Sequence, residues 1–255
     1  MSFEPVNRLE GHVAVITGGK GAIGMATAHR LARLGVRIVS LDRSSKQNVQ
    51  ALLDRLPSAT SGAHIALTAS ITDSASLQAA ANAVLAKAGR CDILINSAGF
   101  TRAVSAGDLE ALTDNLFDEI VQSNLRGVFA TIRAFAPLLK ASGDGLIVNV
   151  SSIAGFTGTG SNLAYVAAKA GVDVLTKSLA KVLAPQVRVL AVSPGVVDSA
   201  FVPGRGADFN DKAAATIPLK RIGTVEDIAS AIEACATTMR FATGSRFVVD
   251  GGRSL

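Results

Sequence analysis

Tryptophan is absent from this chain of 255 residues, tyrosine occurs once and cysteine twice. The two cysteines, Cys91 and Cys235, are far apart and have neither a metal-ligand nor a redox spacing. We therefore expect free thiols in a reducing compartment, no disulfide and no metal site. A low aromatic content beside 24 glycines suits close-packed layers of helix on sheet.

Long apolar runs and basic clusters are also missing. No uninterrupted apolar stretch reaches the roughly 18 residues of a membrane span, and the N-terminus lacks the pattern of a signal peptide, so we expect a cytoplasmic protein that does not enter a membrane. The formal charge is +5, but lysines and arginines are scattered singly, which argues against nucleic acid as a partner. Without repeats or a linker-like stretch, residues 1–255 are predicted to form a single domain.

What is present is a regular alternation of strand and helix patterns. Apolar residues recur at helical spacing between short β-branched runs, for example at Ile23, Ala26, Leu31 and Leu34. This alternation predicts an α/β fold of the Rossmann-like, doubly wound kind, with a seven-stranded parallel sheet and helices on both faces. The predicted strands are 12–17, 36–42, 64–68, 92–96, 145–150, 187–192 and 246–250.

A glycine-rich turn, TGGKGAIG at 17–24, follows the first predicted strand and opens the first helix. Glycines allow a tight turn whose backbone N–H groups approach a pyrophosphate at the positive end of the helix dipole. The second strand ends in Asp42, 18 residues after Gly24, where an acidic residue would bind an adenosine ribose. A carboxylate there favours NAD over NADP, whereas Arg43 and Lys20 could neutralise a 2′-phosphate and leave NADP possible.

The single tyrosine, Tyr165, stands four residues before Lys169 in a predicted helix over 161–183, with Ser161 or Asn162 as its N-cap. Residues i and i+4 share a helix face, so an ammonium there would lower the pKa of the phenol from about 10 toward neutrality. Such a phenol can exchange protons with a substrate. Upstream, a strand ends in Ser151 and Ser152, and the flexible segment after it could bring a serine beside the tyrosine.

These motifs together resemble the short-chain dehydrogenase/reductase family, from about Gly11 to Gly252. Ser152 lies 13 residues before Tyr165, the spacing of the family's catalytic serine, and Asn124 in SNLRG matches its asparagine. The remaining matches are NSAG at 96–99, SPGVVDS at 193–199, PLKRIGTVEDIA at 218–229 and VDGG at 249–252.

The resemblance implies an oxidoreductase that transfers a hydride between NAD(H) and a secondary alcohol or ketone. It implies that Tyr165 is the general acid/base, that Lys169 lowers its pKa and binds the nicotinamide ribose, that Ser152 orients the substrate oxygen and that Asn124 anchors a water. The implied cofactor contacts are Thr17, Gly18, Lys20, Ala22, Ile23, Gly24, Asp42, Arg43, Ser70, Ile71, Asn96, Ala98, Gly99, Tyr165, Lys169, Pro194, Gly195, Val197 and Ser199.

Four positions depart from the family pattern. Ala22 replaces a glycine in the loop, Ser70 an aspartate that often binds adenine, Ser97 the second asparagine of NNAG and Ser199 a threonine near the carboxamide. All four changes are conservative, and none removes a catalytic residue.

The substrate site is less determined. We expect the irregular segment 199–217 to form a lid, with pocket walls at 100–104 and 153–157 and at Val196. Arg102 or Arg205 could bind a carboxylate, but a solvated surface role is favoured for both. The family resemblance further implies a homotetramer, or a homodimer, built on helices around 113–136 and 161–183 and on the C-terminal strand.

Three other functions compete with this prediction. An NADPH-dependent 3-oxoacyl thioester reductase shares the length and motifs, and Asp42 speaks against it. A catalytically silent NAD-sensing module would not need the intact Asn, Ser, Tyr and Lys set. A nucleotide-sugar epimerase shares the Tyr-Lys pair but normally has a larger substrate domain.

Overall fold

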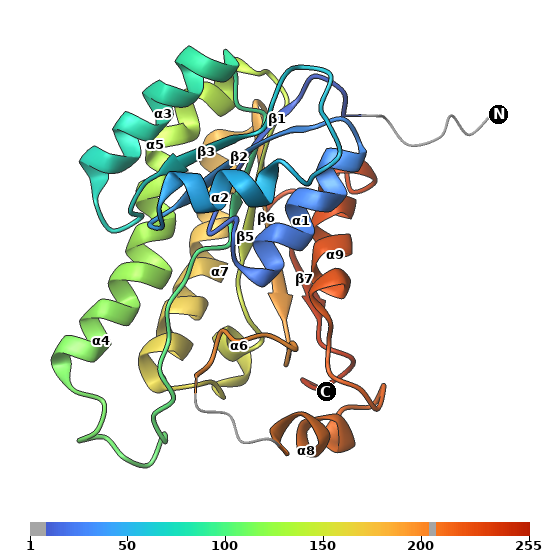
Figure 1. Cartoon of the computed structure of the whole chain (residues 1–255). Coiled ribbons are helices and arrows are strands. Elements are labelled where there is room, and N and C mark those ends of the chain that lie inside the picture. The colour runs from blue at the N-terminus through green and yellow to red at the C-terminus, as the bar shows by residue number, and fades with distance from the viewer. Residues whose placement is uncertain (1–8, 204–207) are drawn as a thin grey trace.

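Parallel strands form the centre of the molecule (Figure 1). The structure is a computed structural model that describes residues 9–203 and 208–255. Within those residues, seven strands make one sheet in the order β3-β2-β1-β4-β5-β6-β7, which confirms the predicted fold class. The strands are β1 (Val13–Thr17), β2 (Arg37–Asp42), β3 (Ile65–Thr68), β4 (Ile93–Asn96), β5 (Gly145–Val150), β6 (Val187–Pro194) and β7 (Arg246–Val249).

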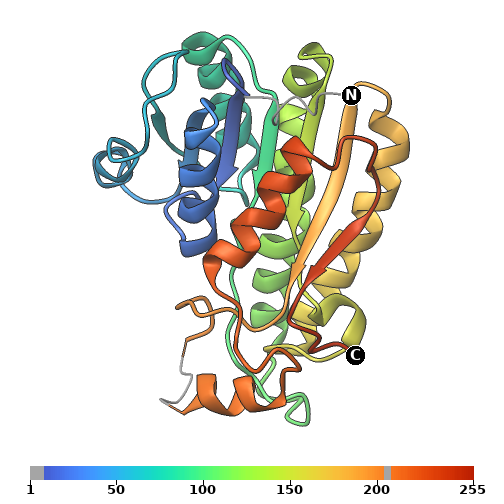
Figure 2. The same cartoon turned by 90° about the vertical axis from the view of Figure 1, so that its right-hand side faces the viewer.

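Helices cover both faces of the sheet (Figure 2). Alternate side chains of β1 enter different cores: Ala14 and Ile16 pack with the layer of α1, α2 and α9, whereas Val13 and Val15 pack with α3, α5 and α7. Burial on both faces explains why the strands read as nearly continuous apolar runs. The helices are α1 (Ala22–Arg33), α2 (Lys46–Leu53), α3 (Ser74–Ala88), α4 (Asp114–Val121), α5 (Gly127–Ala141), α6 (Ala154–Thr157), α7 (Leu163–Leu183), α8 (Phe209–Thr216) and α9 (Val225–Thr237).

The strand order reverses between β1 and β4. After β3 the chain crosses to the other side of β1, so the loops that follow β1 and β4 leave the sheet in opposite directions and open a crevice at its carboxyl edge. Helices α6 and α8 and the C-terminus lie at this same end of the molecule (Figures 1 and 2). No helix in the described ranges is both long and apolar enough to cross a bilayer.

The glycine-rich turn has the tight geometry that its sequence predicts. Gly18 has φ 66°, and a Cβ on it would lie 2.9 Å from the Cα of Ala98. A Cβ on Gly24 would lie 2.3 Å from the carbonyl oxygen of Gly18, so the first turn of α1 packs directly on the loop. Ala22 is the exposed first residue of α1, where its extra methyl group meets no such restriction.

A π-helical turn, η1 (Gln122–Arg126), joins α4 to α5 and carries Asn124. Such turns insert one extra residue into a helix and are frequent at functional sites. The sequence contains no clear signal of this turn, because Val121 and Leu125 keep the ordinary four-residue helical spacing. The turn moves Asn124 to the buried side of the helix, where it is fully enclosed.

The predicted lid, 199–217, is only partly described. Residues 204–207, which include Arg205, lie outside the described residues. The remainder contains helix α8, although the segment was predicted to be irregular.

Candidate active site

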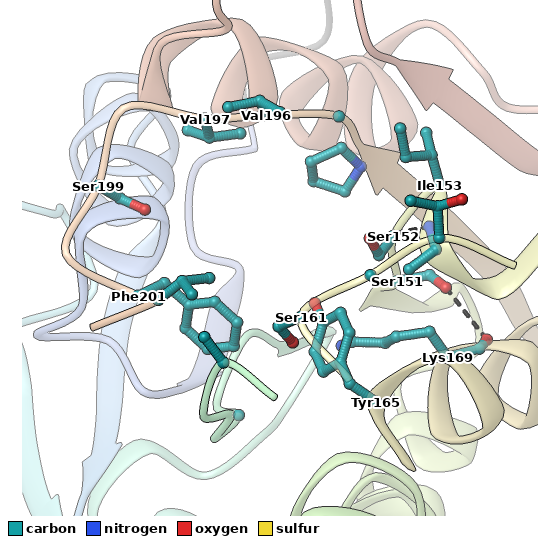
Figure 3. Close-up of a pocket in the computed structure, with 18 of the residues that line it drawn as sticks. Ser151, Ser152, Ile153, Ser161, Tyr165, Lys169, Val196, Val197, Ser199 and Phe201 are labelled. Atoms are coloured by element: carbon teal, nitrogen blue, oxygen red, sulfur yellow. Dashed lines mark hydrogen bonds between the residues drawn. The ribbon is translucent and has the colours of Figure 1, made fainter. Parts of the chain in front are cut away.

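A cavity of about 1030 Å³ lies at the carboxyl end of the sheet and contains three of the four predicted catalytic residues (Figure 3). Ser152, Tyr165 and Lys169 line it together, although they come from the loop after β5 and from α7. Val196, Val197, Ser199 and Phe201, from the segment after β6, face them across the space (Figure 3). The fourth predicted residue, Asn124, is fully buried and does not line the cavity; its Oδ1 would lie 2.7 Å from a Cβ on Gly99, which does.

Tyr165 is placed by the N-terminal cap of α7. The cap is Asn162, one of the two predicted candidates, whose Oδ1 accepts a hydrogen bond of 2.7 Å from the backbone N–H of Tyr165. The amide nitrogen of Asn162 donates to the carbonyl oxygen of Arg102 at 2.7 Å, which ties the loop after β4 to this helix end. The half-buried phenol ring lies 6.0 Å from the ring of Phe201, centre to centre.

Lys169 is buried one turn farther along α7. Its Nζ donates a 2.7 Å hydrogen bond to the carbonyl oxygen of Val150 and lies 5.5 Å from the centre of the Tyr165 ring. Burial lowers the pKa of Lys169 to about 8, and the negative charge of Asp173 works in the opposite direction. The ammonium and its neutral form are therefore both accessible near physiological pH.

Asp173 is held in place by a residue of β7. Arg246 donates to its Oδ2 at 2.8 Å, and the Asp173 side chain is only 6% exposed. The guanidinium also stacks over the ring of Phe156, 3.9 Å from its centre. Segments α6, α7 and β7 thus join in setting the charge environment of Lys169.

Ser152 keeps its hydroxyl proton available. Its Oγ accepts a 3.1 Å hydrogen bond from the backbone N–H of Ala154, so the O–H can donate to a substrate oxygen. Ser151 also lines the cavity, but it is buried and its hydroxyl donates to the carbonyl oxygen of Lys169 (Figure 3). A Cβ on Gly155 would lie 2.7 Å from the backbone of Lys169, so this glycine lets the serine loop approach α7.

Asn124 connects the π-helical turn to the loop after β4. Its amide nitrogen donates to the carbonyl oxygens of Phe100 at 2.5 Å and Ile120 at 2.9 Å, and its Oδ1 accepts from the N–H of Phe100 at 3.3 Å. Both amide protons are used within the protein, which leaves acceptor capacity on Oδ1 for a water.

The Asp42 carboxylate is fixed beside the glycine-rich turn. It is buried and accepts from the Ser40 hydroxyl at 2.5 Å and from the backbone N–H of Lys20 at 3.3 Å. Gly19 has no room for a side chain, since a Cβ would lie 2.2 Å from the Ser40 oxygen. The Lys20 ammonium hydrogen-bonds the Ser44 hydroxyl. The tight glycine turn and the anchored carboxylate together fit a dinucleotide.

Two of the predicted cofactor contacts, Thr17 and Asn96, have buried side chains that bond other parts of the protein. Thr17 is 1% exposed, and its hydroxyl accepts from the N–H groups of Ser97 and Ala98 at 3.2 Å each. Asn96 is 3% exposed and donates to the Asn149 side chain at 2.8 Å. Both side chains are enclosed by protein: that of Thr17 holds the start of the loop after β4, and that of Asn96 links β4 to β5.

The other predicted cofactor residues divide between two regions. Ile23, Gly99, Tyr165, Lys169, Pro194, Gly195, Val197 and Ser199 line the cavity. Gly18, Lys20, Ala22, Gly24, Asp42, Arg43, Ser70, Ile71 and Ala98 lie outside its lining. In this second group, the Ser70 hydroxyl bonds that of Thr72 at 2.9 Å and Ile71 packs on Gly127.

The predicted substrate walls are correct in part. Val104, Ile153, Val196 and Phe201 line the cavity, and so does Arg253, which the sequence reading missed. Phe100 instead packs against the apolar cluster beneath α4. Arg102 is exposed and does not belong to the lining, in agreement with the favoured surface role rather than with carboxylate binding.

Comparison with known proteins gives consistent matches along nearly the full chain. Residues 18–254 match the family described as enoyl-(acyl carrier protein) reductase. The chain is 34% identical over 250 residues to the 3-oxoacyl-(acyl-carrier-protein) reductase FabG of Thermotoga maritima, covering 96% of this chain and 98% of that protein.

Solved structures agree with the sequence matches. Levodione reductase superimposes with a TM-score of 0.88 at 29% identity, covering 96% of this chain and 98% of its own. A protein of Burkholderia xenovorans described as a short-chain dehydrogenase/reductase gives a TM-score of 0.86 at 32% identity, covering 95% and 97% of the two chains.

Proposed function

Since the chain belongs to the short-chain dehydrogenase/reductase family and is an oxidoreductase, we propose that it interconverts a ketone and a secondary alcohol with NAD(H), using Tyr165 as general acid/base. The observation that carries this proposal is the convergence of Ser152, Tyr165 and Lys169 on one cavity, with the lysine Nζ 5.5 Å from the tyrosine ring centre. The test is a screen of secondary alcohols and ketones with both nicotinamide cofactors. The reaction is followed by the absorbance of the reduced nicotinamide at about 340 nm.

The three side chains have separable roles. The Ser152 hydroxyl donates to the substrate oxygen and orients it, and the Tyr165 phenol gives that oxygen a proton in reduction or takes it in oxidation. The positive charge of Lys169 favours the phenolate through the low-dielectric interior. A bound nicotinamide cofactor would supply or accept the hydride.

Residues at the carboxyl edge of β1 and β2 would hold that cofactor. The backbone of the glycine turn and the N-terminus of α1 suit a diphosphate, and Asp42 suits the two hydroxyls of an adenosine ribose. Pro194, Gly195 and Val197 would contact the nicotinamide half. NAD(H) is favoured because a 2′-phosphate would meet the carboxylate of Asp42.

Asp173 provides a test of how Lys169 supports the tyrosine. Its negative charge raises the pKa of Lys169, so Asp173→Asn should make the lysine lose its proton at lower pH. We therefore expect the alkaline limb of the pH profile of kcat/KM to move to lower pH, because the charged lysine supports the reaction. The profile is measured between pH 6 and 10, a range of about two units on each side of the pKa of Lys169.

Arg246→Gln is the matched control for that experiment. It removes the cation that competes with Lys169 for Asp173 and leaves the carboxylate in place. If Asp173 acts through its charge, this variant does not move the limb to lower pH. Equal loss of kcat/KM at every pH in both variants would indicate a purely structural role and contradict the prediction.

A 3-oxoacyl thioester reductase is the second candidate, favoured by the similarity to the Thermotoga maritima protein of that name. The apolar cavity side chains Val104, Val196 and Phe201 are compatible with an acyl chain. Comparing acetoacetyl thioesters with simple ketones of the same length, under NADH and NADPH, separates the two proposals. A strong NADPH preference with thioesters would replace the NAD(H) assignment.

We also propose that the chain forms a homotetramer through α5 and α7. Phe129 on α5 is 40% exposed, and Val174 and Val182 on α7 are 63% and 70% exposed, so these apolar side chains can pack against a second chain. Light scattering should give about four times the 26.0 kDa of one chain. Phe129→Glu should reduce that mass, whereas Leu85→Glu on α3 should not. A monomeric mass for the unmutated protein would contradict this.

A further inference from the structure

The C-terminal segment after β7 contributes a positive charge to the cavity. Among the described residues that line it, Lys169 and Arg253 carry the only charges, and no acidic side chain is present. Lys169 is buried beside the tyrosine, whereas Arg253 is exposed. Both charges of this lining are positive, so the cavity favours an anionic ligand.

The backbone around Arg253 is fixed by Asp250. Its carboxylate accepts hydrogen bonds of 2.8 Å from the N–H groups of Gly252 and Ser254, on either side of the arginine. Although partial burial would raise the pKa of Asp250, these hydrogen bonds hold it below its usual value, so the carboxylate stays ionised and the turn stays closed at neutral pH.

The two glycines before Arg253 press this turn against the segment that follows α8. Gly251 and Gly252 have φ angles of 65° and 89°, which favour glycine. A Cβ on Gly251 would lie 2.8 Å from Ile217, and one on Gly252 would lie 2.9 Å from Pro218. The close contact brings the arginine beside the last turn of α8, at the cavity.

The guanidinium has a neutral partner and donors to spare. Its Nη1 donates to the Thr216 hydroxyl at 2.9 Å, and that hydroxyl donates in turn to the carbonyl oxygen of Ala213 at 2.8 Å. Within residues 9–203 and 208–255, no carboxylate pairs with Arg253, whereas Arg221 and Arg246 each have one. Thr216 therefore orients the guanidinium without neutralising it.

We propose that Arg253 binds an anionic group of the substrate, a carboxylate or a phosphate, while Tyr165 and Ser152 act on its carbonyl. The inference rests on the proposed ketone reduction and narrows it to substrates that carry a negative charge away from the reacting carbon. Among the described residues none accepts a hydrogen bond from Nε or Nη2, and a planar guanidinium with these two donors suits either anion because it can form two parallel hydrogen bonds. Apolar side chains such as Val196 and Phe209 line the cavity with it and suit the carbon chain of such a substrate.

The experiment compares charged and neutral substrates of the same carbon skeleton. Straight-chain 2-, 3- and 4-oxo acids are assayed against their methyl esters, and acetoacetyl-CoA against the uncharged N-acetylcysteamine thioester. In the unmutated protein we expect kcat/KM to favour the charged member of at least one pair by about tenfold, the lower range of a charge-assisted hydrogen bond. A preference within the acid pairs indicates that the site binds a carboxylate. A preference for acetoacetyl-CoA indicates that it binds the phosphates of coenzyme A.

Arg253→Gln should remove this preference. In this variant we expect kcat/KM for the charged substrate to fall about tenfold and kcat/KM for the neutral partner to change less than about threefold. Arg253→Lys should restore part of the loss because it keeps the positive charge. Thr216→Val should give a smaller loss of the same kind, since it frees the guanidinium. Arg55→Gln, an exposed arginine outside the cavity, should behave as the unmutated protein.

Two results would overturn the inference. One is an unmutated protein that reduces neutral ketones at least as well as every charged partner. The other is an Arg253→Gln variant that remains folded, judged by its Tm, but whose kcat/KM falls equally for charged and neutral substrates. Failure of the proposed function is distinguishable from both, because then no ketone of either kind would be reduced with either cofactor.

Discussion

Tyr165→Phe is expected to lower kcat by at least about 100-fold, and by up to about 10,000-fold, the range of a general acid/base. The variant loses one oxygen and nothing else. Its ring keeps the packing against Phe201, whose ring centre is 6.0 Å away, and the N-cap hydrogen bond from Asn162 goes to the backbone. The loss would therefore come from the missing proton donor rather than from a change in the cavity.

The measurement is the pre-steady-state and steady-state rate of NADH oxidation with the best ketone from the screen. Binding of NADH, followed by its fluorescence, and the Tm should both stay close to the unmutated values, because the substitution is nearly isosteric. Ser152→Ala is a useful companion: it should also lower kcat, since it removes the hydroxyl that orients the substrate oxygen. Full turnover by Tyr165→Phe would exclude the proposed mechanism.

Asp42→Ala is expected to remove a preference of about 100-fold or more for NADH over NADPH in kcat/KM, since placing two negative charges together costs several kcal/mol. The Asp42 carboxylate is fixed by the Ser40 hydroxyl at 2.5 Å and the Lys20 N–H at 3.3 Å, so it cannot turn away from a phosphate at low cost. Use of NADH should weaken at the same time, because the ribose loses its hydrogen-bond acceptor.

Two variants separate charge from shape in that experiment. Asp42→Asn keeps the size and an acceptor oxygen, so it should restore part of the NADH activity while still admitting NADPH. Glu110→Ala removes an exposed acidic residue elsewhere and should leave the ratio unchanged. If the unmutated protein already prefers NADPH strongly, the assignment of NAD(H) is wrong and the thioester reductase becomes the better proposal.

Local patterns carried the predictions that the structure confirmed. Each strand is an apolar run because the sheet is covered on both faces. The glycine-rich turn can be recognised in the sequence because the close backbone contacts at Gly18 and Gly24 leave no room for a side chain. The pairing of Tyr165 with Lys169 follows from helix geometry alone. The wall prediction that failed concerns a loop: Phe100 follows β4 as expected, but nothing in its sequence says that it packs beside α4 instead of lining the cavity.

The sequence by itself therefore determined the strands, the tight glycine turn and the placing of Tyr165 one helical turn before Lys169, because each depends on residues close together in the chain. Only the tertiary structure decided how those groups are tuned. Three features join segments that are far apart in sequence. Lys169 is buried against Val150, Arg246 holds the carboxylate of Asp173, and Arg253 lines the cavity. Their physical basis is desolvation and charge proximity, which depend on distance in space and leave no periodic trace in the sequence.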